Sequence, residues 1–130
     1  MKVELLNGAN LAFIGDAYYE LYIRKYCLDK GITNQKELHK ECVKYVSAHA
    51  HYQIFEKLEK ENFFTEKEMV YFKRGRNHSY HANRKNVNPS EYVISSGFES
   101  LIGYLYMSEE NQRLEELMKK SIEIIEGKDE

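Results

Sequence analysis

The chain has 130 residues, of which 42% are hydrophobic and 31% charged, and its formal net charge at neutral pH is −2. A chain of this length forms one domain, here residues 1–130, and its charge balance excludes a generic nucleic-acid binder with a basic surface throughout. No apolar run reaches the roughly 18 residues that cross a membrane, and the N-terminus lacks the apolar stretch of a secretory signal. We therefore expect a cytoplasmic protein without a membrane partner, whose two cysteines, Cys27 and Cys42, are free thiols.

The hydrophobic pattern predicts an all-α protein, because apolar residues recur at helical spacing and no stretch alternates with the period of a strand. Asn34 and Thr65 are each followed three residues later by a glutamate, as in a capping box. In chain order we expect a first helix at 11–28, a second opened by Asn34, a third capped by Ser47, a fourth from Thr65 that stops at Gly75, a polar loop at 76–88, a fifth at 90–107 after Pro89, and a last at 109–126 capped by Ser108.

The first predicted helix carries an acidic residue among apolar ones. Apolar side chains cover both of its sides, which is typical of a buried helix, and ionised carboxylates are seldom buried unless they are paired or hold a metal. Asp16 is therefore a candidate metal ligand, and Gly15 beside it indicates that another element packs closely there. Pairing with Arg24 and capping of a helix start are alternative roles for Asp16. Glu20, one helical turn later, is a candidate outer ligand or a structural partner of Arg24.

The fifth predicted helix repeats this pattern, because its segment 97–107, GFESLIGYLYM, is apolar except for Glu99 and one small hydroxyl. Two such helices can bring Asp16 and Glu99 together, and hard carboxylate oxygens suit Mg²⁺ or Mn²⁺ better than zinc. Such an ion activates water and stabilises charge on a scissile phosphate. The histidines are weaker candidates for ligands, because His49 and His51 are two residues apart on a helix and point in different directions.

Positive charge is concentrated in one segment of the chain. Residues 70–89 contain five basic residues and no acidic one, whereas the rest has 14 Lys and Arg against 21 Asp and Glu, a balance of −7. A local basic segment on an acidic body indicates a directed contact with a polyanion such as a phosphate backbone. A solvated loop without a ligand is the alternative.

Two segments resemble the two halves of the endonuclease signature of the ribonuclease III family: NLAFIGDA at 10–17 and FESLIGYLY at 98–106. Three further segments are similar to its short Mini-III branch, namely GDAYYE at 15–20, YVSA at 45–48 and KRGRN at 73–77. The resemblance covers residues 5–126. Larger members of the family usually carry acidic residues at three further positions, which are occupied here by Ala9, Ala12 and Ser96. Mini-III proteins likewise lack acidic residues at these positions.

The resemblance implies an all-α ribonuclease III-like domain that cleaves double-stranded RNA with Mg²⁺, for which Mn²⁺ can substitute, and that leaves 5′-phosphate and 3′-hydroxyl ends. Asp16 and Glu99 would be the catalytic metal ligands, with Glu20 and Ser96 as candidate outer-shell groups. The segment 73–89 would be an RNA-contacting insertion, and its candidate RNA-binding residues are Lys73, Arg74, Arg76, Asn77, His78, Arg84 and Lys85.

The resemblance also implies partners. The active unit would be a symmetric homodimer, and tyrosines on the two acid-bearing helices are candidates for its interface or for an ordinary core: Tyr18, Tyr19, Tyr22, Tyr104 and Tyr106. Mini-III proteins are associated with maturing both ends of the large-subunit (23S) ribosomal RNA precursor, in cooperation with a large-subunit ribosomal protein bound to that RNA.

Two other functions fit the same residues. One is a non-catalytic RNA-binding scaffold for ribosome assembly, which Ala12 and Ser96 favour and which the presence of Asp16 and Glu99 opposes. The other is an all-α metal-dependent nucleotide pyrophosphohydrolase. Such an enzyme needs a denser cluster of acids on facing helices, whereas the acid-rich segments here are typical of solvated helix faces.

Overall fold

The computed structural model describes residues 1–79 and 89–128, and within them it contains helices and no strand. The elements follow in this order: η1 Val3–Leu5, α1 Gly8–Asp29, α2 Gln35–Val46, α3 Ala48–Lys60, α4 Glu66–Ser79, α5 Pro89–Met107 and α6 Asn111–Glu126. The predicted all-α class is therefore confirmed. None of the described helices is both long enough and apolar enough to cross a membrane.

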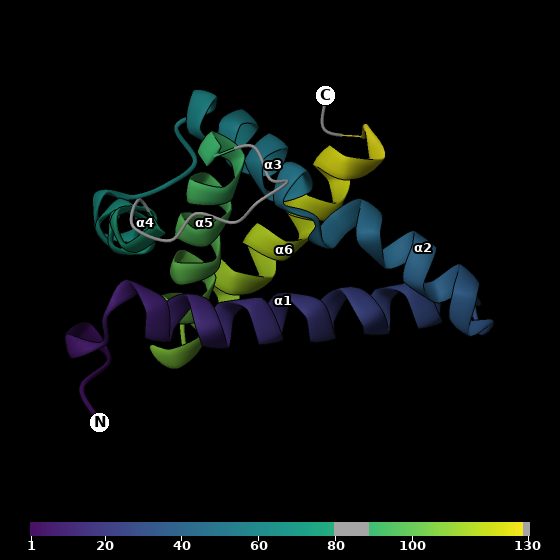
Figure 1. The fold of residues 1–130 in the computed structure, drawn as a ribbon, viewed down its shortest axis with the longest axis horizontal. Coiled ribbons are helices and arrows are strands. Elements are labelled where there is room, and N and C mark those ends of the chain that lie inside the picture. Colours follow the sequence, from purple (N-terminus) through teal and green to yellow (C-terminus); the bar gives the residue numbers. More distant parts are fainter. Residues whose placement is uncertain (80–88, 129–130) are drawn as a thin grey trace.

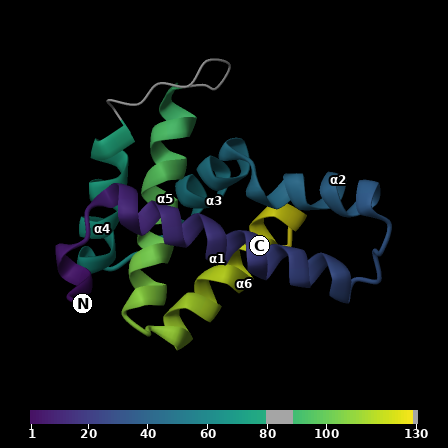
Figure 2. The same ribbon diagram turned by 60° about the horizontal axis from the view of Figure 1, so that its bottom comes forward.

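Helix α5 is the centre of the fold. Figure 1 shows α1 crossing it, with α4 along one side and α3 and α6 close to the others, and Figure 2 shows the same arrangement from a turned view. Its buried side chains lie on almost every side of the helix: Val93, Ser95, Phe98, Ser100, Leu101, Ile102, Tyr104 and Leu105. The prediction that this apolar helix is buried is confirmed.

Helix α1 is buried on one side alone, which corrects the prediction of a buried helix. Its buried stripe repeats about every four residues: Gly8, Leu11, Gly15, Tyr19, Ile23 and Cys27. On the opposite side Phe13 is 81% exposed and Leu21 is 69% exposed. Asp16 is also exposed. The apolar residues of α1 therefore form two separate faces, one in the core and one on the surface.

The crossing of α1 and α5 depends on two glycines. A Cβ atom added to Gly15 would lie 1.8 Å from the backbone oxygen of Glu99, and one added to Gly103 would lie 1.9 Å from that of Leu11. The two helix backbones therefore touch at this point, and no side chain fits between them. The predicted close packing at Gly15 is confirmed.

The helix starts are set by side-chain caps, most of which the sequence predicts. Asn34 accepts from the backbone N–H of Glu37 at 3.1 Å, and Ser47 accepts from that of Ala50 at 3.1 Å. Thr65 and Glu68 form a reciprocal capping box with bonds of 3.1 and 3.0 Å. The predicted cap at Ser108 is wrong, because α6 begins at Asn111 after two residues that complete the turn.

Helix α4 does not stop at Gly75 but continues to Ser79, which is a second correction. Gly75 is not a helix terminator here, since a Cβ atom at this position would lie 2.5 Å from the backbone oxygen of Ser96 on α5. The glycine allows close helix packing and leaves α4 intact. Asn77 and His78 consequently lie on the last turns of a helix and not in the predicted loop.

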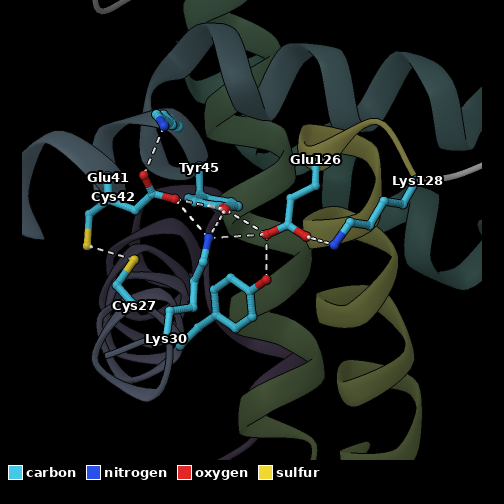
Figure 3. Close-up of polar contacts among 9 residues, drawn as sticks. Cys27, Lys30, Glu41, Cys42, Tyr45, Glu126 and Lys128 are labelled. Carbon is cyan, nitrogen blue, oxygen red and sulfur yellow. Dashed lines mark hydrogen bonds and ion pairs between the residues drawn. The ribbon is translucent and has the colours of Figure 1, made fainter. Parts of the chain in front are cut away.

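A polar network joins the end of α1 to α2 and α6 (Figure 3). Glu126 accepts hydrogen bonds from Tyr26, from Tyr45 at 2.8 Å and from Lys128 at 3.1 Å. Burial alone would raise the pKa of Glu126, but these bonds outweigh it and lower the pKa to about 2. Beside this network, Cys27 and Cys42 are buried free thiols, as predicted.

Candidate functional site

A cavity of about 380 Å³ opens where α1, α4 and α5 meet the junction of α2 and α3. Asp16 enters it from α1 and Glu99 from α5, so residues 83 positions apart in the sequence line one site. The other residues that line it are Gly8, Ala9, Ala12, Phe13, Val46, Ala48, Gly75, His78, Tyr92, Ser95 and Ser96.

The two carboxylates differ in their surroundings. Asp16 is exposed on α1, whereas the side chain of Glu99 is 20% exposed and lies closer to the core. The backbone contact at Gly15, the neighbour of Asp16, involves the carbonyl of Glu99 itself. The rigid helix crossing therefore fixes the positions of both acids relative to each other.

The small residues that stand where larger family members are expected to carry acids lie in the same cavity. Ala9, Ala12 and Ser96 all line it, together with Asp16 and Glu99. Among the described residues, no group of three or more His, Cys, Asp and Glu side chains is placed to hold a metal. The site therefore offers two carboxylates and two serine hydroxyls, which are hard oxygen donors, next to small side chains that leave room for water.

Glu20 lies outside this cavity. Its Oε2 atom is 3.0 Å from Nε of Arg24, one turn along α1. It lines a different cavity between α1 and α2, together with Leu38 and His39. Of the two roles predicted for Glu20, the structure favours pairing with Arg24 over contact with a metal ion.

His51 lies beneath the site, fully buried, and its sequence pattern predicts no role for it there. Its Nδ1 atom is 2.9 Å from Oγ of Ser95 and 3.9 Å from Oε2 of Glu99. Burial lowers the pKa of His51 to about 3, so its imidazole is neutral. The signal for its burial is its spacing from Ile54, Phe55 and Leu58, because i, i+3, i+4 and i+7 share one helix face.

The predicted RNA-binding residues on α4 fall into two groups. Lys73, Asn77 and His78 are exposed, and His78 lines the cavity. Arg76 is half-buried, and its guanidinium lies 5.9 Å from the ring centre of Phe72. Within this group, His78 is the residue that lines the cavity with the two carboxylates.

Arg74 has a different position. Its Nη1 atom donates to the backbone oxygens of Glu4 at 2.6 Å and Leu6 at 3.1 Å, and its guanidinium lies 4.6 Å from the ring centre of Tyr71. It holds the N-terminal turn against α4. Arg84 and Lys85 lie outside the described residues.

The chain is similar to known proteins along most of its length. The model of the ribonuclease III domain matches residues 9–110. The Mini-ribonuclease 3 of Streptococcus pneumoniae is 45% identical over 127 residues, which cover 98% of this chain and 99% of that protein. That of Staphylococcus aureus is 40% identical over 123 residues, with 95% and 92% covered.

A solved structure has the same fold. The crystal structure of protein FN1578 from Fusobacterium nucleatum superposes with a TM-score of 0.81 at 28% sequence identity, covering 92% of this chain and 93% of that one. The family match includes both segments that carry Asp16 and Glu99. The chain therefore belongs to the ribonuclease III family and, within it, to the Mini-ribonuclease 3 group.

Proposed function

We propose that the protein is a metal-dependent endoribonuclease that cleaves double-stranded RNA. The observation that carries the proposal is that Asp16 and Glu99 line one open cavity, which His78 of α4 also lines. Membership of the ribonuclease III family supports the reaction class.

The donor set fits Mg²⁺, with Mn²⁺ as a substitute. Asp16 and Glu99 would hold the ion, and Ser96 would contact it through water. When bound, the ion activates water and stabilises the charge that develops on the phosphate. Glu20 remains a candidate for long-range electrostatic support alone, because its carboxylate pairs with Arg24.

The residues on α4 would hold the phosphate backbone next to the two acids. A-form RNA is recognised mainly through its phosphates and 2′-hydroxyls. Lys73, Arg76, Asn77 and His78 supply donors along the last two turns of α4, and His78 lines the cavity. In this proposal Arg74 acts indirectly, since it fixes the N-terminal turn through two carbonyl contacts. Cleavage of the bond between the scissile phosphorus and O3′ would leave 5′-phosphate and 3′-hydroxyl ends.

The exposed apolar face of α1 supports a symmetric homodimer. Phe13 and Leu21 lie two turns apart on this face, and Tyr106 of α5 is 44% exposed beside the ring of Tyr18, at 5.3 Å. An isologous interface needs such a self-complementary apolar patch. Tyr19 and Tyr104 do not belong to it, because they are 1% and 4% exposed and form part of the core.

Resemblance to Mini-III supports a cellular substrate, the paired stem that joins the two ends of the 23S ribosomal RNA precursor. It also supports cooperation with a large-subunit ribosomal protein bound to that RNA. The acidic body of this chain, with its basic segment at 70–89, fits an enzyme that is helped to position its substrate.

The test is incubation of a perfectly paired RNA duplex with Mg²⁺ and the native chain, beside Asp16→Asn. We expect cleavage by the native protein, inhibition by EDTA and loss of at least roughly 100-fold in rate for the variant, with duplex binding retained. Sedimentation of the native protein gives its oligomeric state. Binding without cleavage in both Mg²⁺ and Mn²⁺ would reject the enzyme and favour the RNA-binding scaffold, whereas turnover of nucleoside triphosphates would favour the pyrophosphohydrolase.

A further inference from the structure

The buried imidazole of His51 makes its polar contacts on the side of the candidate site. Ser95 and Glu99 lie one helical turn apart on α5, and the Nδ1 atom of His51 approaches both, at 2.9 Å from the hydroxyl and 3.9 Å from the carboxylate. His51 itself comes from α3 and is 0% exposed. Three side chains from two helices therefore form a short polar path from the core to a proposed ligand.

The rest of the ring lies in apolar surroundings. The rings of Tyr19 and Phe98 are 4.6 and 5.1 Å from that of His51. Its Nε2 atom is buried and has no hydrogen-bond partner in the part of the chain that the structure describes. An apolar ring would pack here without an unsatisfied nitrogen, so core packing alone does not explain a histidine at this position.

We propose that His51 is a positioning residue, which through Nδ1 and the hydroxyl of Ser95 sets the orientation of the Glu99 carboxylate in the cavity. This inference rests on the proposed function, because it assigns His51 a role in the metal site of that enzyme. In this role His51 would be a buried residue that orients one of the two carboxylates of the site.

The geometry selects the tautomer with the proton on Nδ1. A carboxylate oxygen 3.9 Å from Nδ1 attracts an N–H group and repels a nitrogen lone pair. With the proton there, Nδ1 donates to Oγ of Ser95, and the serine keeps its own proton to donate. Glu99 lies one turn further along the same face of α5, and its Oε2 atom is 3.9 Å from Nδ1 of His51, so this carboxylate can accept from the serine hydroxyl.

Such support matters more when ligands are few. A glutamate side chain has three rotatable bonds, and ordering them opposes binding of an ion. Groups that orient a metal ligand from behind typically contribute about 10–100-fold to metal affinity or activity. Asp16 and Glu99 are the two carboxylates among the described residues that line the cavity, so loss of orientation at Glu99 affects half of the charged ligands.

The experiment compares four single variants and one double variant for Mn²⁺ affinity, by electron paramagnetic resonance, and for single-turnover cleavage of duplex RNA at subsaturating Mg²⁺. His51→Phe keeps a ring of similar shape and removes both nitrogens, whereas His51→Gln keeps a donor and an acceptor. Ser95→Ala removes the hydroxyl. Tyr19→Phe is the matched control, because it loses a buried hydrogen bond to the backbone oxygen of Tyr45, at 2.7 Å, on the far side of the same ring cluster.

We expect His51→Phe and Ser95→Ala to weaken Mn²⁺ binding and slow cleavage by about 10–100-fold, with duplex affinity in EDTA unchanged. His51→Gln should recover most of this loss, and Tyr19→Phe should bind Mn²⁺ as the native protein does. Combining His51→Phe with Ser95→Ala should cost no more than either change alone.

The inference is overturned if Ser95→Ala and the folded His51 variants keep native Mn²⁺ affinity, or if Tyr19→Phe loses as much. Ser95→Ala decides the matter even where His51→Phe does not fold. Failure of the proposed function is distinct, because the native protein would then neither bind Mn²⁺ nor cleave the duplex.

Discussion

The crossing of α1 and α5 predicts a large effect for one added methyl group, in Gly15→Ala. The new Cβ atom would lie 1.8 Å from the backbone oxygen of Glu99 and 2.7 Å from the backbone nitrogen of Gly103, whereas real contacts of this kind exceed 3.0 Å. Neither atom belongs to a flexible side chain. The two helices must therefore separate by more than an ångström at the point where they carry Asp16 and Glu99.

The magnitude follows from two opposed terms. Overpacking of a core contact costs about 1–3 kcal/mol, with the upper end expected for a backbone clash, and alanine regains roughly 1 kcal/mol over glycine in a helix. A net loss of about 2 kcal/mol leaves a domain of ordinary stability folded. Displacement of catalytic groups by about 1 Å typically costs about 100-fold in rate, so we expect a folded protein that cleaves at least that much more slowly.

The assay combines urea denaturation, followed by circular dichroism, with single-turnover cleavage by the folded variant. Gly31→Ala is the matched control, because Gly31 has a φ of +91° and no atom within 4 Å of an added Cβ. That change strains the backbone by about 1–2 kcal/mol at the end of α1, far from the crossing, and should leave cleavage by folded molecules unchanged. Native stability and native cleavage in Gly15→Ala would refute the reasoning.

Two further predictions concern the arginines of α4 and the polar network around Glu126. Arg76→Ala should weaken duplex binding and lower the slope of log affinity against log salt by about 1. Arg74→Ala loses two hydrogen bonds to the backbone oxygens of Glu4 and Leu6, so it should chiefly lower the melting temperature. Equal salt slopes for the two variants would contradict this division. The folded-state pKa of Glu126, about 2, lies below its ordinary value of 4.5, so its contribution to stability is present above pH 4.5 and is lost as the pH falls towards 2. Urea denaturation at pH 7 should show that the free energy of unfolding of Glu126→Gln is about 2 kcal/mol lower than that of the native protein, after allowance for solvent screening. At about pH 2 the difference should be much smaller. An equal loss of stability at both pH values would contradict this role of Glu126.

The sequence predicts local features of this fold well, because they depend on neighbouring residues. The caps at Asn34, Ser47 and Thr65 are each confirmed by a hydrogen bond to the residue three positions later. Gly15 also indicates a close approach, since a glycine inside an apolar helix destabilises it unless the missing side chain makes room for a neighbour. The prediction at Gly75 is wrong for a related reason, because a glycine after basic residues is typical both of a helix end and of a helix contact.

The features that the sequence does not predict depend on distant parts of the chain. Hydrophobic periodicity cannot distinguish a face buried in the core from one left on the surface, so it predicts a buried α1 although Phe13 is exposed. Glu20 and Asp16 share a helix face in the sequence, yet α2 forms a separate cavity around Glu20. The contact of His51 with Ser95 joins residues 44 positions apart, which no local pattern indicates.

In the proposed enzyme, the small residues around the two acids would leave room for a hydrated Mg²⁺ ion. Ala9, Ala12 and Ser96 stand where the resemblance places acids in larger members of the family, and all three line the cavity with Asp16 and Glu99. Mg²⁺ keeps several of its waters and takes one or two carboxylates in many enzymes, so the space left by alanine side chains suits a hydrated ion. The cost is less negative charge, which predicts weaker metal binding. With two acids in the proposed site, we expect the orientation of each carboxylate, as well as the number of acids, to determine how well the ion is held.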